Sequence, residues 1–233
     1  MRKIGIIETG RPPEELVAKH GDYSTMIRHW LDLDAEYTTI PVLDGALPGD
    51  PADAASWIFT GSRFGVYEDH PWIPPLEAFI RACGDRSTPI IGICFGHQLI
   101  AQALGGKVCK SDKGWGLGVH EYPVLRRPEK IGPLPSSFLI EAFHQDQVEG
   151  APHSARVVAS SDFCPNALLY YPDFALTIQG HPEFSAEYAT DLIELRRGSS
   201  FDNSTAEKGL EAVMNRTNSE TFARIARELI ARI

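Results

Sequence analysis

The segment Ile90-Ile91-Gly92-Ile93-Cys94-Phe95-Gly96-His97-Gln98-Leu99-Ile100-Ala101 decides the fold of this chain. It opens as a short apolar run rich in β-branched residues, which predicts a buried strand, and it ends in an apolar pattern typical of a helix. Cys94 stands between the two, with Gly92 two positions before it and Gly96 two positions after it. This is the layout of a nucleophile elbow, a tight turn from strand to helix that lifts one side chain out of the sheet.

The predicted elbow would also make the thiol of Cys94 reactive. Glycine is needed on both sides because larger residues would collide where the chain folds back on itself. The first N–H groups of the following helix carry partial positive charge, which favours the thiolate, the reactive form of a cysteine. A free cysteine is otherwise more often a buried structural thiol. The two glycines and the change from strand to helix favour a nucleophile here.

The composition predicts one globular α/β domain over residues 1–233. Hydrophobic residues make up 43% of the chain and charged residues 23%, which is enough for a sizeable core. The formal net charge of -9 argues against a nucleic-acid partner. No apolar run approaches the ~18 residues of a membrane span, and the apolar stretch at the start is too short for a signal peptide. The four cysteines form no CxxC pair, so neither disulfides nor a zinc framework is expected. A cytoplasmic location is therefore predicted.

The first half of the chain alternates between strand-like and helix-like segments. Besides the segment around Cys94, strands are predicted over 3–8, 37–43 and 54–60, and helices over 24–33 and 74–83. Pro41 indicates that its strand lies at an edge or ends early. The loop that begins at Gly61 follows a strand, and open α/β sheets place their ligand contacts at such carboxyl ends.

Beyond residue 106 the pattern changes to short β-rich segments at close spacing, which predicts an antiparallel section joined to the parallel one. These segments are 107–110, 119–126, 137–143, 156–161, 167–171 and 174–180. Further helices are predicted over 186–197 and 219–233, with a polar loop over 198–205. No break in composition divides the chain into two domains.

A cysteine nucleophile needs a base, and the base needs an orienting group. His181 and Glu183 follow the apolar segment 174–179. Because they are two positions apart, they point to the same face in extended backbone, and Pro182 fixes φ between them. A carboxylate beside an imidazole holds its tautomer and stabilises the protonated ring. A His-x-Glu sequence alone is more often a surface pair, so its place at the carboxyl end of a strand is what favours catalysis.

Two motifs together resemble those of the class I (triad) glutamine amidotransferases. The sequence Gly92-Ile93-Cys94-Phe95-Gly96-His97-Gln98 is similar to the nucleophile motif of that family, and Gly180-His181-Pro182-Glu183 is similar to its His-Pro-Glu motif. The resemblance covers most of the chain. It implies a flavodoxin-like α/β fold, with a central, mostly parallel sheet flanked by helices and an additional antiparallel section. It also implies a catalytic triad of Cys94, His181 and Glu183.

The resemblance further implies which groups hold the substrate. The N–H of Phe95 and one N–H of the Gly61-Ser62 loop would stabilise an oxyanion. Ser62 stands where the family usually carries a second glycine, so the sequence leaves open whether Gly61 or Ser62 donates. The residues that match substrate-contacting segments of the family are Gln98, His144 and Gln145. For the last two, a hairpin end is the alternative.

The activity that the resemblance implies is hydrolysis of a γ-glutamyl amide, either glutamine or another γ-glutamyl compound, through a thioester on Cys94. The products would be glutamate and ammonia or an amine, and neither a metal nor an organic cofactor is expected. Ammonia would pass to a separate synthase subunit, or the chain would be a stand-alone hydrolase similar to guanylate-synthase-like amidotransferases and γ-glutamyl peptidases. Segments 61–69 and 143–148 favour the stand-alone hydrolase. The alternatives are a non-catalytic or regulatory binding protein, against which the complete Cys-His-Glu set argues, and a cysteine redox or stress protein.

Overall fold

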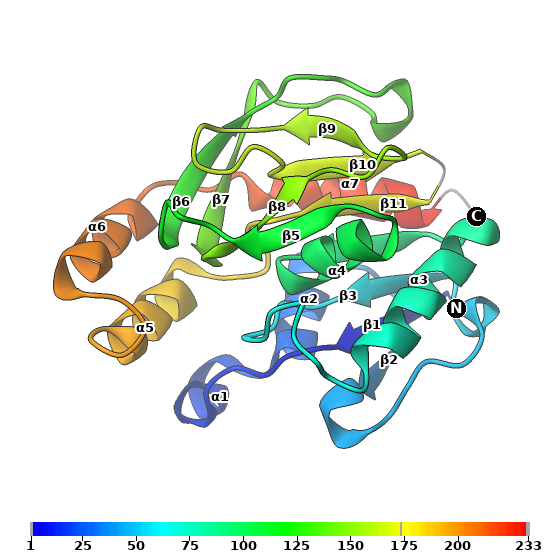
Figure 1. Cartoon of the computed structure of the whole chain (residues 1–233), viewed down its shortest axis with the longest axis horizontal. Coiled ribbons are helices and arrows are strands. Elements are labelled where there is room, and N and C mark those ends of the chain that lie inside the picture. Colours follow the sequence, from blue (N-terminus) through cyan, green and yellow to red (C-terminus); the bar gives the residue numbers. More distant parts are fainter. Residues whose placement is uncertain (1, 173, 232–233) are drawn as a thin grey trace.

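A central sheet of seven strands runs through the computed structural model, which describes residues 2–172 and 174–231 (Figure 1). The strands are β1 (Lys3–Glu8), β2 (Glu36–Pro41), β3 (Ser56–Phe59), β4 (Ile90–Ile93), β9 (Arg156–Ala159), β10 (Leu168–Tyr171) and β11 (Ala175–Ile178). Their order across the sheet is β2-β1-β3-β4-β11-β10-β9. Neighbouring strands from β2 to β11 in this order pair in parallel. Strand β10 pairs antiparallel with both β11 and β9. The predicted α/β fold with a mostly parallel sheet and an antiparallel section is confirmed.

Helices cover both faces of this sheet. Over the described residues they are α1 (Glu14–His20), α2 (Tyr23–Leu31), α3 (Ile73–Asp85), α4 (Phe95–Ala103), α5 (Ala186–Arg196), α6 (Asn203–Val213) and α7 (Ser219–Ala231). Helices α3 and α4 pack on one face, and α2 and α7 pack on the other. Helices α5 and α6 lie together beyond one end of the sheet, on the left in Figure 1.

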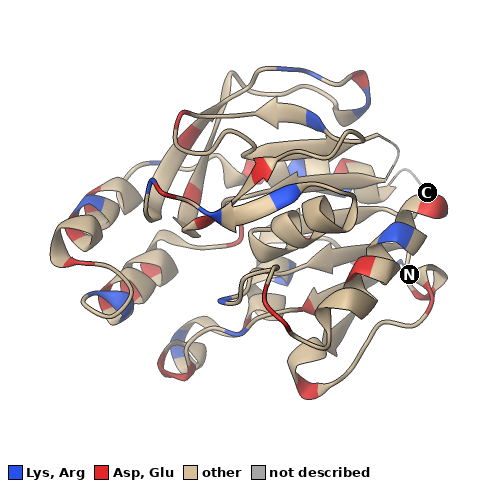
Figure 2. Ribbon diagram, in the orientation of Figure 1, with Lys and Arg blue, Asp and Glu red and all other residues tan. Residues whose placement is uncertain are grey.

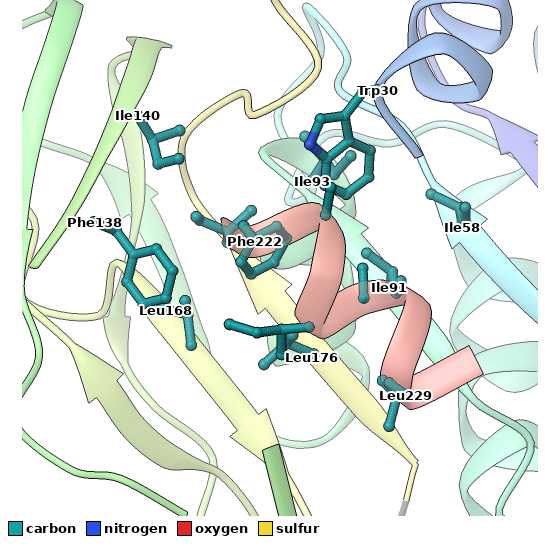
Figure 3. Packing of buried hydrophobic residues seen from close by; sticks show 14 of the residues in the cluster. Trp30, Ile58, Ile91, Ile93, Phe138, Ile140, Leu168, Leu176, Phe222 and Leu229 are labelled. Carbon is teal, nitrogen blue, oxygen red and sulfur yellow. The ribbon is translucent and has the colours of Figure 1, made fainter. Parts of the chain in front are cut away.

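The alternation of side chains along the strands fills both interior layers. Ile58 and Ile91 face the cluster formed with α2 and α7, whereas Trp57 and Phe59 face α3 and α4. Figure 3 shows Phe222 of α7 between Phe138 of β7 (Ser137–His144) and Trp30 of α2. Each such buried side chain contributes about 1.5–3 kcal/mol relative to an exposed one. Burial on both faces explains why the strands read as continuous apolar runs.

Two antiparallel ribbons stand apart from the main sheet. One pairs β5 (Lys107–Lys110) with β8 (Asp146–Gly150), and the other pairs β6 (Gly116–Pro123) with β7 (Ser137–His144). Ile140 of β7 joins the cluster around α2 and α7. Gln145 links β7 to β8 and so connects the two ribbons. This residue and its neighbours His144 and Asp146 line a cleft.

The polar loop predicted over 198–205 is wrong from Asn203 onward, where α6 begins. Asp202 caps this helix, because its carboxylate accepts the N–H of Thr205 at 2.7 Å. The buried face of α6 consists of small residues, Ala206, Gly209 and Val213. Polar residues dominate the start of this helix, which is why its sequence indicates a loop there.

Other boundaries also shift. Strand β2 ends at Pro41, and the predicted strand residues beyond it turn into a short 3-10 helix, Val42–Asp44. As Pro41 indicates, β2 lies at an edge of the sheet. Strand β8 has no counterpart among the predicted strands. Of the helix predicted over 219–233, residues 232–233 lie outside the described residues.

Charged residues are spread over the surface elements rather than gathered by sign. In Figure 2, both basic and acidic residues appear along α5 and α6. Asp191 of α5 binds both Lys19 and His20 of α1, with a distance of 2.7 Å to each, and so joins two helices that are far apart in sequence. Exposed pairs of this kind contribute at most about 1 kcal/mol. No helix within residues 2–172 and 174–231 is long and apolar enough to cross a membrane.

Candidate active site

The carboxyl ends of β3, β4 and β11 meet at one edge of the parallel sheet, because the three strands are neighbours in its order. The chain leaves β3 toward Gly61, leaves β4 at Cys94 and leaves β11 toward His181. Residues from three distant parts of the sequence therefore converge where open α/β sheets place their ligands.

Cys94 occupies a strained backbone position between β4 and α4. Its φ of 51° and ψ of -102° lie in a region that residues with a Cβ rarely adopt, at a cost of order 1–3 kcal/mol. Three backbone hydrogen bonds hold the turn. The N–H of Cys94 donates to Ile178 at 2.9 Å, that of Gly96 to Thr60 at 3.1 Å, and that of Gln98 to the carbonyl of Cys94 at 3.0 Å. This is the elbow that the sequence predicts.

Gly96 explains why the elbow requires glycine, and it supports a stability prediction. A Cβ at Gly96 would stand 2.5 Å from the carbonyl oxygen of Phe59 and 2.6 Å from its Cβ. We expect Gly96→Ala to lower the free energy of unfolding by about 1–3 kcal/mol, measured by urea unfolding. Gly150→Ala is the matched control, because its Cβ would approach only Lys107, at 3.6 Å. Equal stability of the two variants would contradict this account of the turn.

His181 and Glu183 form the pair that the sequence predicts. The Nδ1 atom of His181 lies 2.8 Å from Oε1 of Glu183, and both side chains are buried. A carboxylate only accepts, so Nδ1 carries the proton and donates it to Glu183. A Cβ at Gly61 would stand 2.7 Å from Cε1 of His181 and 3.7 Å from the Cβ of Cys94, so Gly61 lies against both side chains. The thiol of Cys94 also lies close enough to His181 to raise the pKa of the imidazole.

The surroundings of His181 favour its protonated form. Burial alone would lower the pKa of His181, but the charges of Glu183 and the Cys94 thiolate outweigh this effect and raise the pKa to about 10. An imidazolium beside a sulfur stabilises the thiolate, as in other cysteine nucleophiles. The arrangement therefore places a cationic ring next to the sulfur of Cys94.

Two aromatic residues that sequence reasoning missed hold the imidazole in place. The ring of Phe184 stacks on His181, with 4.0 Å between centroids and 11° between planes. Tyr23, at the start of α2, stacks in turn on Phe184 at 5.9 Å. Both line the cleft. Phe184 directly follows the His-Pro-Glu motif and could have been suspected from this position, whereas no pattern around Tyr23 points to the site.

The converging residues open onto a cleft of about 960 Å³. Of the predicted site residues, those that line it are Ser62, Cys94, Gln98, His144, Gln145 and His181. Among the described residues, Gly61, Phe95 and Glu183 are not part of the lining. Gly61 and Phe95 could therefore contact a ligand only through their backbone N–H groups, and Glu183 acts through His181.

Gln98 and His144 both bind the backbone carbonyl oxygen of Asp146. Gln98 donates from Nε2 at 2.8 Å, and Nδ1 of His144 lies at 3.2 Å. Burial lowers the pKa of His144 to about 3, so the ring is neutral, and Nδ1 donates because a carbonyl only accepts. Its Nε2 is thus a buried acceptor, with no partner among the described residues.

The loop after β3 is held by a threonine pair. The hydroxyl of Thr9 donates to the carbonyl of Thr60 at 2.9 Å, and the N–H of Thr9 donates to the hydroxyl of Thr60 at 3.0 Å. The hydroxyl of Ser62 accepts the N–H of Phe64 at 3.3 Å. These contacts fix the backbone that carries Gly61 opposite the first N–H groups of α4, which have no partner within the helix.

A second acidic residue lies next to the histidine. Glu141 of β7 is 1% exposed, and neither of its carboxylate oxygens has a hydrogen-bond partner within residues 2–172 and 174–231. Its backbone carbonyl accepts the N–H of His181 at 2.7 Å. Burial raises the pKa of Glu141 to about 7, and the positive charge of His181 only partly opposes this effect.

Glu141→Gln is expected to stabilise the protein at alkaline pH only. Because the folded-state pKa of Glu141 lies above the unfolded value of 4.5, its favourable contribution is complete below pH 4.5. That contribution is lost as the pH rises through 7, where a charged carboxylate must stay buried. Urea unfolding at pH 8 should show a gain of up to about 3 kcal/mol, and at pH 4.5 almost none. A gain of the same size at both pH values would contradict this expectation.

Comparisons with known proteins agree with this geometry. Residues 64–197 match the family Glutamine amidotransferase class-I. A glutamine amidotransferase-like protein of Schizosaccharomyces pombe is 28% identical over 236 residues, which cover 94% of this chain and 95% of that protein. Gamma-glutamyl peptidase 4 of Arabidopsis thaliana is 31% identical over 192 residues, which cover 78% of this chain and 76% of that protein.

The fold has a counterpart among solved structures. A glutamine amidotransferase from Thermotoga maritima superposes with a TM-score of 0.76 at 18% identity, covering 99% of this chain and 98% of that one. The family match takes in more than half of the chain, and both the elbow at Cys94 and the His181-Glu183 pair fall inside it. The chain belongs to the class I glutamine amidotransferase family.

Proposed function

We propose that this protein, as one amidotransferase domain, hydrolyses γ-glutamyl amide bonds through a thioester on Cys94. The observation that carries the proposal is the meeting of three side chains at one sheet edge. Cys94 stands on a strained elbow, His181 and Cys94 both adjoin Gly61, and Oε1 of Glu183 lies 2.8 Å from Nδ1 of the imidazole. A nucleophile, a base and an orienting group are the parts that acyl transfer requires.

In the first half of the reaction, the thiolate of Cys94 attacks the γ-carbonyl carbon of the substrate. The electron pair of the C=O bond moves to oxygen, where the N–H of Phe95 and an N–H of Gly61 or Ser62 stabilise the negative charge. The C–N bond then breaks as His181 gives its proton to the departing nitrogen. Ammonia or an amine leaves, and the glutamyl group stays on the sulfur as a thioester.

The second half regenerates the thiol site. Water attacks the thioester carbon while the now neutral His181 takes its proton. The same N–H groups stabilise the second oxyanion, the C–S bond breaks, and glutamate leaves. Cys94 returns to the thiolate and His181 to the imidazolium. Glu183 stays charged throughout and stabilises the protonated ring each time it forms.

The cleft favours a substrate larger than glutamine. Its volume of about 960 Å³ lies near the upper end of the range for pockets that take drug-sized ligands, and glutamine is far smaller. Gln98, His144 and Gln145 would hold the γ-glutamyl group, because they line the cleft and include the buried acceptor Nε2 of His144. The remaining space would take the amine part of a γ-glutamyl peptide. The similarity to a protein named gamma-glutamyl peptidase supports the same choice.

A mass-spectrometric screen of γ-glutamyl compounds tests this proposal. Glutamine, γ-glutamyl peptides and γ-glutamyl amines are each incubated with the protein, and the released amine and the mass of trapped enzyme are measured. We expect turnover of γ-glutamyl peptides with a glutamyl adduct on Cys94. Preferential turnover of glutamine would instead assign the chain to ammonia supply beside a separate synthase subunit. Turnover of none of these compounds would overturn the proposed activity.

A further inference from the structure

A chain of buried side-chain amides leads from the cleft to the sulfur of Cys94. Gln98 is 3% exposed and donates from Nε2 both to the carbonyl oxygen of Asp146, at 2.8 Å, and to Oε1 of Gln179, at 3.2 Å. Gln179 directly follows β11 and is fully buried. Its own Nε2 donates to Sγ of Cys94 at 3.7 Å. The triad chemistry assigns no role to Gln179.

The first link of this chain fixes the orientation of both amides. The carbonyl of Asp146 can only accept, so the NH₂ group of Gln98 must face it. The second N–H of the same group faces Gln179 and calls for an acceptor there. Gln179 therefore turns its carbonyl oxygen toward Gln98, which leaves its NH₂ group toward the sulfur. A backbone atom outside the elbow thus decides that a donor, and not an acceptor, meets Cys94.

We propose that Gln179 is a catalytic residue that stabilises the thiolate of Cys94, and that Gln98 is a positioning residue that decides which end of the Gln179 amide meets the sulfur. The consequence for turnover rests on the proposed function, whereas the effect on the thiol does not.

Gln179 has a task that His181 alone does not perform. A hydrogen bond from N–H to an anionic sulfur is charge-assisted and roughly twice as strong as a neutral one, and the buried site keeps competing water away. His181 gives its proton to the leaving nitrogen and regains one only from the attacking water, so its charge changes during turnover. The amide of Gln179 does not titrate. It can therefore stabilise the sulfur as negative charge returns to it when the C–S bond breaks.

The test follows the alkylation of Cys94 by iodoacetamide across a pH series, read by mass spectrometry of the labelled peptide. The midpoint of the rate profile reports how readily the thiolate forms and needs no substrate. We expect Gln179→Met to move this midpoint upward by about one pH unit, since the variant keeps the volume but removes the donor. Gln179→Glu should move it at least as far, because an oxygen would then face the sulfur. Gln98→Met should move it in the same direction by a smaller amount.

Thr177→Val is the matched control. Thr177 lies two residues earlier on β11, is fully buried and binds Nδ1 of His97 at 2.7 Å, so its loss removes a comparable buried hydrogen bond that does not reach Cys94. Its midpoint should equal that of the unchanged protein. An unchanged midpoint in either folded variant of Gln179 would overturn the proposal. A shifted midpoint without turnover of any γ-glutamyl compound would uphold Gln179 and reject the proposed function.

Discussion

Replacing Cys94 with alanine is expected to lower kcat/KM toward a γ-glutamyl peptide by at least about 10⁴-fold. A thioester needs a sulfur nucleophile, and Cys94 is the only cysteine among the described residues that line the cleft. The backbone strain at φ 51° should remain, since alanine keeps the Cβ. The melting temperature should therefore change little while activity disappears. Amine release measured by mass spectrometry and thermal unfolding together check both parts.

Cys109→Ala is the control for this variant. Cys109 is a free cysteine with partial solvent exposure, whereas Cys83 and Cys164 are buried. Its replacement should leave kcat/KM within about twofold. If Cys94→Ala kept full γ-glutamyl hydrolysis, the chemistry would not pass through a thioester, and the chain would retain the fold for another purpose. A redox role would appear instead as oxidation of Cys94 that does not depend on His181.

The sequence locates best those parts of the site that depend on neighbours along the chain. The elbow needs only a strand, a cysteine between two glycines and a helix, and all of these lie within residues 90–101. The His181-Glu183 pair likewise follows from alternation over three residues and from the end of an apolar strand. That these two pieces meet could be expected from the resemblance. Strand direction could not have predicted it, because the pattern places 174–180 in the antiparallel section, whereas β11 pairs with β4 in parallel.

The parts that could not be predicted depend on contacts between distant segments. Tyr23 supports the imidazole through Phe184, but its sequence surroundings indicate only the start of a helix. The orientation of Gln179 depends on a carbonyl at Asp146, and spacing along one strand does not reveal such a contact. The sequence around Glu141 indicates only a polar position in a strand. The backbone bridge between Glu141 of β7 and His181, which follows β11, shows that this buried residue adjoins the histidine.

Glu183→Gln should reduce kcat by about 10⁴-fold while leaving the fold intact. The variant keeps an oxygen that can accept from Nδ1 of His181, so the ring need not move far. It removes the negative charge that, together with the charge of Cys94, raises the pKa of His181 to about 10 against the effect of burial. The imidazolium would then form less readily, both beside the resting thiolate and in the step in which water is deprotonated. Steady-state rates against pH measure the loss.

The same substitution predicts a change in stability that a merely structural carboxylate would not produce. The folded-state pKa of His181 lies above its unfolded value of 6.5, so its stabilising contribution is complete below pH 6.5 and is lost as the pH rises through about 10. Glu183→Gln should remove part of this contribution at pH 6 and have little effect on it above pH 10. Glu187→Gln serves as the control, because Glu187 is an exposed carboxylate that pairs with Lys19 at the surface. If Glu183→Gln destabilised the protein equally at both pH values, the carboxylate would act through packing. The stabilisation of a negative charge on Cys94 would then have to come from His181 and from the N–H of Gln179 alone.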